Sequence, residues 1–385
     1  MAGWLKVGLL LLTGVCAAFQ VGKVAPIIDI LGETFRADVG TLAWLSSTIS
    51  IIGGTLGLAI GISLGRIGYG TALIGGILLM AAGCLLSSFS TTFPHFLIGR
   101  VIEGTAYIII FVSIPGLIFR VAKSEARTAL ALWASAVPTG IVLAMLTVPY
   151  LNSSIGWRTA WQILAVCFVA LAALNYFARG PVAESSAAIT IEKRQIIATI
   201  TSPAVLRLAW CFFAYAGIWF IFVTWTPYLL RIGKADSWLS IPRFSALVVG
   251  ANVGGNLAGS FFISRGNKVA PLLMTAFAAN LLASVYLLQG ITSAHVIIPA
   301  AAFASLVSGV LPPAIMAAIG MRAKTHYDVA IGNSLIMQSS NLAALIMPPV
   351  FGFLYASFPT SQPAIALISI LAISGLVASV LHSKS

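Results

Sequence analysis

Long apolar runs recur along the whole of this chain, and they restrict its fold more than any other feature. Each run is long enough, at about 1.5 Å of rise per helical residue, to cross a hydrocarbon core of roughly 30 Å. Only 8% of the residues are charged, and most of these fall between the runs. The sequence therefore predicts an all-α integral membrane protein with twelve transmembrane helices. The predicted helices cover residues 4–30, 38–64, 71–90, 94–121, 127–151, 157–178, 204–231, 239–264, 269–289, 293–320, 328–355 and 362–381.

Charge and cysteine content exclude several other classes of protein. The net charge is +12, but Lys and Arg are dispersed singly rather than gathered in a basic run, so no nucleic-acid partner is expected. The four cysteines lie inside apolar runs without metal-ligand spacing, and we expect no metal and no cofactor. The four histidines sit at predicted helix ends, and no His-Glu-x-x-His pattern occurs, so an enzyme is not expected.

Landmarks in the first half of the chain recur about 200 residues later. Pro26 corresponds to Pro227, Arg66 to Arg265, and His95 to His295, near the corresponding ends of the predicted helices. A constant offset indicates two parallel six-helix repeats, an arrangement in which transporters place a substrate site between the halves. We predict an N-terminal six-helix bundle over 1–178, a polar cytoplasmic linker over 179–203 and a C-terminal six-helix bundle over 204–385.

The distribution of basic residues predicts the orientation in the membrane. Most of the 21 Lys and Arg residues fall on the cytoplasmic side if both termini are cytoplasmic, as the positive-inside rule requires. The loops are short apart from the linker. We therefore expect an integral protein of the bacterial inner membrane, with the lipid bilayer as its solvent.

Three motifs resemble those of the major facilitator superfamily. The run Gly61-Ile-Ser-Leu-Gly65-Arg66-Ile-Gly68 resembles the loop signature after helix 2, although Gly65 replaces the usual Asp. Arg100-Val-Ile-Glu103-Gly104 resembles a motif of helix 4, and Gly156-Trp157-Arg158 resembles an element before helix 6.

Within that superfamily, the sequence looks most like the branch of cyanate and nitroimidazole permeases. The resemblance is carried by the run from Gln20 to Pro26, by Leu132-Trp133 and the following Pro138-Thr-Gly140, and by the Gly-Trp-Arg element. It implies a monomeric transporter whose helices 1, 4, 7 and 10 line a central cavity.

Charged residues inside the predicted helices are the strongest candidates for function, because a charge in hydrocarbon is costly. Lys23, Arg100 and Glu103 lie at similar depth, and the implied fold would place them beside the cavity. We expect Lys23 and Arg100 to bind an anionic substrate and Glu103 to carry the coupling proton. The alternative is that Arg100 and Glu103 only neutralise each other along the helix. Asp29 and Glu33 are expected to be solvated at the helix end.

The second half lacks these charges and offers aromatic and amide side chains. Tyr215 and Trp219 share a helix face and are candidates to pack on a substrate, or equally are core residues. The candidate amides, which either bind substrate or join helices, are Asn252, Asn256, Gln338 and Asn341. The predicted packing or gating positions are Gly57, Gly61, Arg66 and Gly68.

These observations favour a secondary active transporter that moves a small anionic solute by alternating access with proton coupling. The alternative is a proton-coupled exporter of amphipathic or cationic compounds, for which the aromatic residues would matter more than the cations. A channel or a sensor would not require two parallel repeats. Dependence of transport on the negative charge of the substrate separates the two transport hypotheses.

Overall fold

Helices account for all the regular secondary structure in the part of the chain that the structure describes. This computed structural model describes residues 2–122, 125, 129, 132–133, 135–178, 193–232, 240–266, 268–287, 294–322 and 326–383. Within these ranges, twelve helical segments are long and apolar enough to span a membrane. The predicted all-α fold with twelve transmembrane helices is confirmed.

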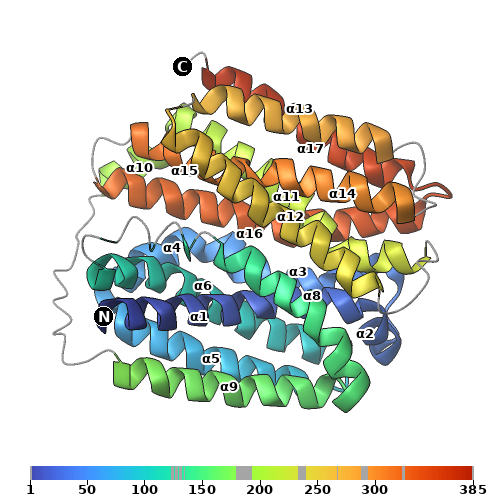
Figure 1. Ribbon diagram of the computed structural model, residues 1–385. Coiled ribbons are helices and arrows are strands. Elements are labelled where there is room, and N and C mark those ends of the chain that lie inside the picture. Colours follow the sequence, from blue (N-terminus) through green and yellow to red (C-terminus); the bar gives the residue numbers. More distant parts are fainter. Residues whose placement is uncertain are drawn as a thin grey trace.

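The chain folds into two groups of helices, which we call the N-half and the C-half (Figure 1). The N-half contains α1 (Ala2–Gly22), η1 (Ala25–Ile27), α2 (Ile28–Phe35), α3 (Val39–Ser47), η2 (Thr48–Ser50), α4 (Ile51–Ile67), α5 (Tyr69–Ser88), α6 (Phe93–Ala122), α8 (Ala136–Ile155) and α9 (Trp157–Ala178). The C-half contains α11 (Pro203–Ile232), α12 (Ser240–Ser264), α13 (Val269–Leu287), α14 (Ala294–Gly309), α15 (Leu311–Arg322), α16 (His326–Ser357) and α17 (Gln362–Ser383).

A short helix, α10 (Lys193–Ile200), precedes the C-half and packs against α16. The rest of the predicted linker before it, residues 179–192, lies outside the described residues. The division of the chain into two bundles at this linker stays a prediction.

Three spans that we predicted as single helices are interrupted. The span over 4–30 breaks after Gly22, where Pro26 supplies no N–H for a helical hydrogen bond and a 3-10 turn forms. The span over 293–320 breaks at Val310, just before Pro312 and Pro313. In the span over 38–64, the Thr48 hydroxyl donates to the Trp44 carbonyl oxygen at 2.6 Å, and a 3-10 turn follows. Apolar periodicity alone does not reveal such breaks.

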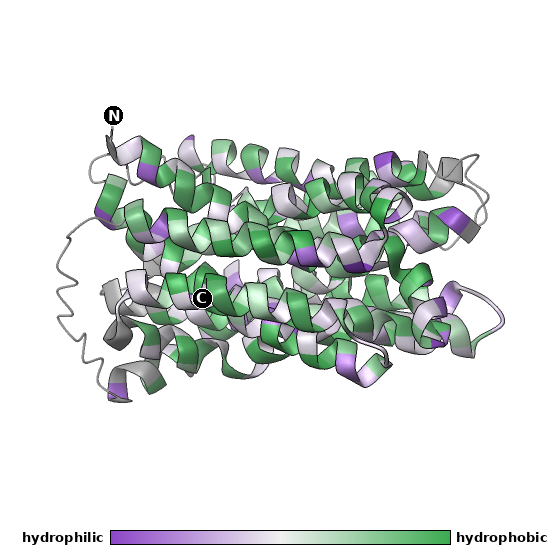
Figure 2. Cartoon of the chain, turned by 90° about the horizontal axis from the view of Figure 1, so that it is seen from below, coloured by the Kyte–Doolittle hydropathy of each residue, from purple (hydrophilic) through white to green (hydrophobic). Residues whose placement is uncertain are grey.

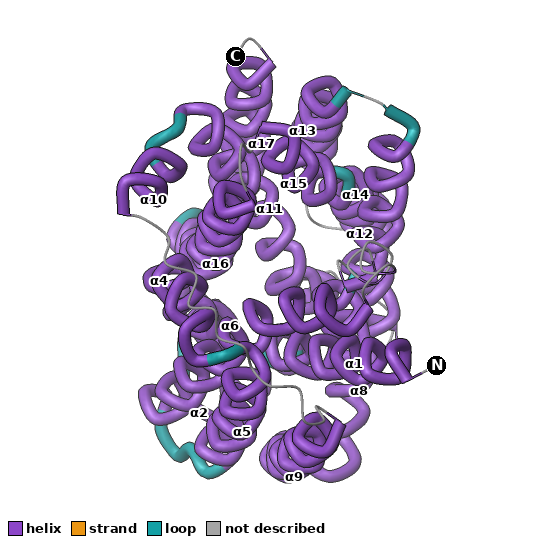
Figure 3. Tube along the Cα trace, turned by 90° about the vertical axis from the view of Figure 1, so that its left-hand side faces the viewer, coloured by secondary structure: helices purple, strands orange, loops and turns teal. Residues whose placement is uncertain are grey.

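Packing is closest within each half and continues across the seam between them. In the N-half, α5 packs on α6 and α9, and α1 packs on α8; in the C-half, α11 packs on α16 and α17, and α12 packs on α14. The halves meet where α16 lies along α4 (Figure 3). In addition, α16 packs against α3, and α12 packs against α8. The 3-10 turn η1 also touches α11. Helices of the two halves therefore form one continuous apolar core at the seam.

The outer faces of the helices are apolar. Green hydrophobic residues predominate along the helices, and many hydrophilic segments lie near the two ends of the bundle (Figure 2). Large apolar side chains such as Leu174, Phe177 and Leu282 are exposed on this surface. Exposed side chains of this kind match a lipid environment rather than water.

One end of the bundle is where α1 begins and α17 ends, and we call it the terminal end (Figure 1). The opposite end, where η1 and α2 lie, is the distal end.

Candidate functional site

The three charged residues predicted within helices converge on a single carboxylate. Lys23 follows the last residue of α1, and its Nζ lies 2.8 Å from Glu103 Oε1. Arg100, one turn before Glu103 in α6, forms an ion pair with Glu103 Oε2 through Nη1. All three side chains are completely buried. The structure therefore brings together residues that lie about 80 positions apart in the chain.

Neutral side chains complete this arrangement, which we call the charge cluster. Arg100 Nη1 also donates to the backbone carbonyl oxygen of Gln20 at 2.9 Å, and Ser87 Oγ donates to Glu103 Oε1 at 3.1 Å. Lys23 Nζ lies 3.6 Å from Cys84 Sγ and 4.5 Å from the centre of the Trp161 ring. The cluster consists of Gln20, Lys23, Cys84, Ser87, Arg100, Glu103 and Trp161. Its neutral members were not among the predicted site residues.

Two glycines explain how α5 and α6 approach closely enough to build the cluster. A Cβ at Gly83 would lie 2.7 Å from Glu103 Cγ and 2.9 Å from the Glu103 backbone nitrogen. A Cβ at Gly99 would lie 2.9 Å from the Ser87 backbone nitrogen. Larger residues at these positions would push the helices apart and remove Glu103 from its partners.

The charge cluster lies inside the N-half, which differs from our expectation for Lys23, Arg100 and Glu103. We expected these residues to face a cavity between the halves. Their partners instead come from α1, α5, α6 and α9, all in the N-half. The rotation of each helix about its axis decides which face a charge occupies, and the depth of a residue in the sequence does not give that rotation.

The charge cluster carries an excess of positive charge, because two cations share one carboxylate. Among the described residues, four of its buried donors also lack a hydrogen-bond partner: Arg100 Nε, Arg100 Nη2, Gln20 Nε2 and Trp161 Nε1. Unpaired donors and an uncompensated charge in a buried site both cost free energy. The mutual neutralisation of Arg100 and Glu103 that we considered is present, but it accounts for only one of the two cations. A further acceptor with negative charge would suit the remaining donors.

Three candidate residues of the C-half, Tyr215, Asn252 and Asn256, form a separate polar network. Tyr215 Oη donates to Asn252 Oδ1 at 3.5 Å, and Asn256 Nδ2 donates to the same oxygen at 2.9 Å. Asn252 Nδ2 in turn donates to the Ser305 carbonyl oxygen at 3.1 Å. Trp219 stacks on Tyr215 with ring centroids 6.4 Å apart, and in the described part of the chain its buried Nε1 has no partner. Of this group, Trp219 is the residue with an unused donor.

The two candidate amides of α16 lie at the seam with α4. Gln338 Nε2 donates to the Thr55 carbonyl oxygen at 3.2 Å, and Gln338 Oε1 accepts from the Leu58 backbone N–H at 3.3 Å. Asn341 packs against Gly53 and donates to the Met337 carbonyl oxygen at 2.8 Å. Of the two roles that we predicted for Gln338, the contacts match the joining of helices.

The predicted packing glycines lie along the same seam. Gly57 faces Gln338, and a Cβ at Gly61 would lie 3.0 Å from Ser334 Oγ. Gly68 ends α4 with a φ of 91°, a left-handed conformation that favours glycine. Arg66 lies in α4, and its side chain is outside the described part of the chain.

An ion pair between the halves was missed by sequence reasoning. Asp29 Oδ2 of α2 pairs with Arg231 Nη1 of α11 at the distal end, although we expected Asp29 to be solvated. The two residues are 202 positions apart on helices of different halves. The sequence therefore contained no local signal for their contact.

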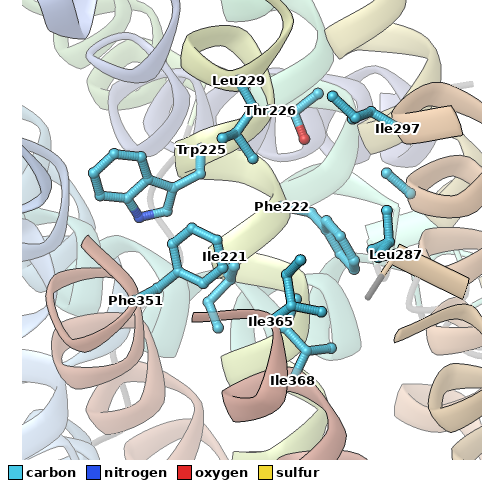
Figure 4. A pocket seen from close by; sticks show the side chains of 11 residues that line it. Ile221, Phe222, Trp225, Thr226, Leu229, Leu287, Ile297, Phe351, Ile365 and Ile368 are labelled. Carbon is cyan, nitrogen blue, oxygen red and sulfur yellow. The ribbon is translucent and has the colours of Figure 1, made fainter. Parts of the chain in front are cut away.

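A separate pocket lies within the C-half (Figure 4). Its cavity volume is only about 20 Å³, and it is lined by apolar side chains, including Phe222, Trp225 and Phe351, with Thr226 as its polar member. None of the described residues that line it is charged, and it lies apart from the charge cluster.

The architecture defines the class of protein: a polytopic helical membrane protein built from two six-helix halves, as in secondary transporters. The chain belongs to the Major Facilitator Superfamily, whose sequence profile matches residues 10–332. This membership places it among transporters rather than enzymes.

A comparison with solved structures supports the same fold. The structure is similar to that of a bacterial homologue of the human lysosomal transporter Spinster, solved in an inward-facing and unoccupied conformation. The TM-score is 0.75 at 12% sequence identity, and the alignment covers 100% of this chain and 95% of that chain. At this identity the likeness shows the fold alone. A search of curated protein sequences gave no significant match.

Proposed function

We propose that this chain is a secondary active transporter that couples the movement of a small anionic solute to protons. The observation that carries the proposal is the charge cluster, in which Lys23 and Arg100 share Glu103 and leave one positive charge uncompensated. Because a buried charge without a counter-ion is costly, an anionic ligand is the partner that this arrangement favours.

Glu103 is the proposed coupling residue. Its two carboxylate oxygens hold both cations, so a proton on Glu103 would weaken both ion pairs at once. The released Lys23 and Arg100 would then attract an anion, and an anion near them would in turn favour the protonated carboxyl. Proton and anion would therefore bind cooperatively and travel together.

The proposed mechanism is alternating access by rocking of the two bundles, residues 1–178 and 204–385, joined by the linker 179–203. The distribution of basic residues supports a terminal end that faces the cytoplasm and a distal end that faces outward. We further propose a monomer in the bacterial inner membrane, related to the branch of cyanate and nitroimidazole permeases.

The competing proposal is an exporter of amphipathic or cationic compounds. The stacked Tyr215 and Trp219, with the unused Trp219 Nε1, support it, since aromatic faces bind both apolar bodies and cations. In that case the charge cluster would be a structural element of the N-half.

Flux measurements in proteoliposomes would decide between the two proposals. A panel of small anions, cations and neutral drugs is tested for uptake and counterflow with an imposed pH gradient. The variants are Lys23→Ala, Arg100→Ala and the charge-conserving Lys23→Arg. Saturable, gradient-driven anion flux that is lost in both alanine variants would support anion transport.

Matched controls are Arg243→Ala and Lys268→Ala, which each remove an exposed cation. These variants should retain flux. Transport of cationic drugs that survives loss of both Lys23 and Arg100 would contradict the proposal and favour the exporter.

A further inference from the structure

A second pocket lies between the halves at the distal end, beside the Asp29–Arg231 ion pair. Its cavity volume is about 160 Å³. Both halves build its walls. The N-half contributes η1, the start of α2 and α8, and the C-half contributes α11 and α12. The lining residues are Pro26, Ile27, Ile30, Met145, Pro149, Asn152, Ser153, Pro227, Arg231, Ile241, Pro242 and Ser245. We call it the distal pocket.

Arg231 is the charged residue among those that line the distal pocket. Its side chain is 42% exposed, so the guanidinium is accessible although Asp29 holds Nη1. Asp29 itself is not among the lining residues. A guanidinium presents five donors in a planar fork, which leaves N–H groups for a second acceptor.

A buried hydroxyl provides a second donor in the distal pocket. Ser245 is 1% exposed, and in the ranges that the structure describes its Oγ has no hydrogen-bond partner. Such an orphan polar atom is expected to pair with a ligand or water. The distal pocket thus combines a cation with an unsatisfied hydroxyl, together with the amide of Asn152.

Four of the wall elements each contribute one proline to the distal pocket. Pro149 and Pro227 lie inside α8 and α11, where each removes a helical hydrogen bond. Pro26 lies in η1 and Pro242 in the first turn of α12. Of the four prolines, those inside α8 and α11 remove helical hydrogen bonds, so these two helices are locally weakened at the distal pocket and can bend there as the halves separate.

We infer that the distal pocket is an outer binding subsite in which Arg231 exchanges Asp29 for the anionic group of the substrate. Only the choice of the transported substrate as ligand rests on the proposed function; the preference for an anion follows from Arg231 and Ser245. The carboxylate of Asp29 occupies Arg231 while the halves are closed. An incoming carboxylate or inorganic oxyanion takes its place and removes an ion pair that joins the halves.

This exchange links ligand binding to opening of the distal end. A ligand shifts a conformational equilibrium only if it binds one state better. An anion binds Arg231 better when Asp29 has moved away, and this happens when the halves separate. Arrival of the substrate therefore favours the distal-open state, and a cation gains no such advantage.

Charge-selective labelling tests the subsite without any knowledge of the substrate. Ser245→Cys places a thiol in the distal pocket of the full-length protein in lipid nanodiscs. Reaction rates are measured with an anionic sulfonate, a cationic trimethylammonium and a neutral thiol reagent, and the chain without the substitution gives the background from its own cysteines. The anionic reagent serves as the probe ligand, and the measured quantity is the ratio of anionic to cationic rates.

Substitutions of the ion pair should move this ratio in opposite directions. Asp29→Asn leaves Arg231 uncompensated and should raise the ratio about sevenfold, the effect of one unit charge at roughly 7 Å in water on two reagents of opposite sign. Arg231→Gln leaves Asp29 uncompensated and should lower it by a similar factor. The double variant should restore the parent ratio. Glu33→Gln removes a nearby exposed carboxylate from the same helix and should have a smaller effect.

A different pattern would overturn the inference. If Asp29→Asn and Arg231→Gln accelerate all three reagents alike, the ion pair is only a latch between the halves and Arg231 does not select anions. If Ser245→Cys does not fold, Ser153→Cys reports from α8 in the wall of the same pocket. Charge-selective labelling in a protein without anion flux would leave the subsite standing and remove only the proposed transport of anions.

Discussion

Glu103 is the residue whose neutralisation should reveal the excess charge of the cluster. Glu103→Gln conserves the volume of the side chain but leaves Lys23 and Arg100 buried without a carboxylate. Removing one partner of a buried ion pair costs about 3–5 kcal/mol. The ring of Trp161, 4.5 Å from Lys23 Nζ, contacts the cation in the parent protein as well and therefore does not change this difference. We expect a destabilisation of about 3–5 kcal/mol.

Lys23→Met should be far less harmful, although it also breaks an ion pair. It leaves Arg100 paired with Glu103 and makes the cluster neutral, so that its cost should be about 1 kcal/mol, comparable to one lost hydrogen bond. The double variant of Lys23 and Glu103 should be more stable than Glu103→Gln alone, because it buries one positive charge instead of two. This ordering follows from charge and not from volume.

The measurement is the rate of irreversible unfolding in detergent micelles at a fixed temperature, followed by tryptophan fluorescence. Large membrane proteins often unfold irreversibly, so that a rate is the appropriate measure of stability. A loss of 3 kcal/mol from the native state alone would accelerate unfolding roughly 160-fold. If Glu103→Gln unfolds no faster than Lys23→Met, then the cluster does not carry the excess positive charge on which the proposed function depends.

Three further predictions concern packing and the seam. Gly104→Ala should destabilise the protein by several kcal/mol, because a Cβ at this position would overlap with the backbone carbonyl of Ile49. The control is Gly75→Ala, whose Cβ meets nothing within 4 Å and which should be neutral or stabilising in the same unfolding assay. Gln338→Leu removes the hydrogen bonds of this amide to α4 and should increase backbone hydrogen exchange around Thr55 and Leu58. The control Ser339→Ala should not change this exchange. Unchanged exchange in Gln338→Leu would show that the amide does not stabilise the contact between α16 and α4. Trp225→Phe removes the 2.9 Å hydrogen bond from Nε1 to the Pro348 carbonyl oxygen and should destabilise the protein by about 1 kcal/mol. Trp210→Phe, at an exposed position, should destabilise it less. Equal effects of the two substitutions would show that this hydrogen bond does not contribute to stability.

The fold was predictable because each membrane-spanning helix requires a long, continuous run of apolar residues, which can be recognised in the sequence. The number of spans and their approximate limits follow from that length and from the cost of unpaired backbone groups in lipid. The helix breaks after Gly22 and at Val310 could not be predicted from apolar length, although prolines follow both positions within four residues. A proline near the middle of a span is compatible with a kink, a 3-10 turn or a full break, and tertiary packing selects among them.

The candidate site was predictable only in part. Lys23, Arg100 and Glu103 stand out because charges are rare inside apolar runs. Their neutral partners Cys84 and Trp161 have no such signal, since both are ordinary residues of a membrane helix. The direction in which the cluster faces depends on how α1 and α6 are rotated against α5 and α9, and the sequence does not give that rotation.

A rocking motion of the two halves would break some ion pairs of this protein and leave others intact. Every partner of Lys23 and Arg100 in the described part of the chain belongs to the N-half, so the charge cluster can move with that half as a rigid unit, without separating buried charges. The pair of Asp29 and Arg231 joins different halves and must break whenever the distal end opens. Its partly exposed position lowers the cost of breaking, because water can solvate both ions. The buried pairs of Lys23 and Arg100 with Glu103, which would cost the most free energy to separate, therefore lie within one half. The pair of Asp29 and Arg231, which separates when the distal end opens, lies where water lowers the free-energy cost of separation.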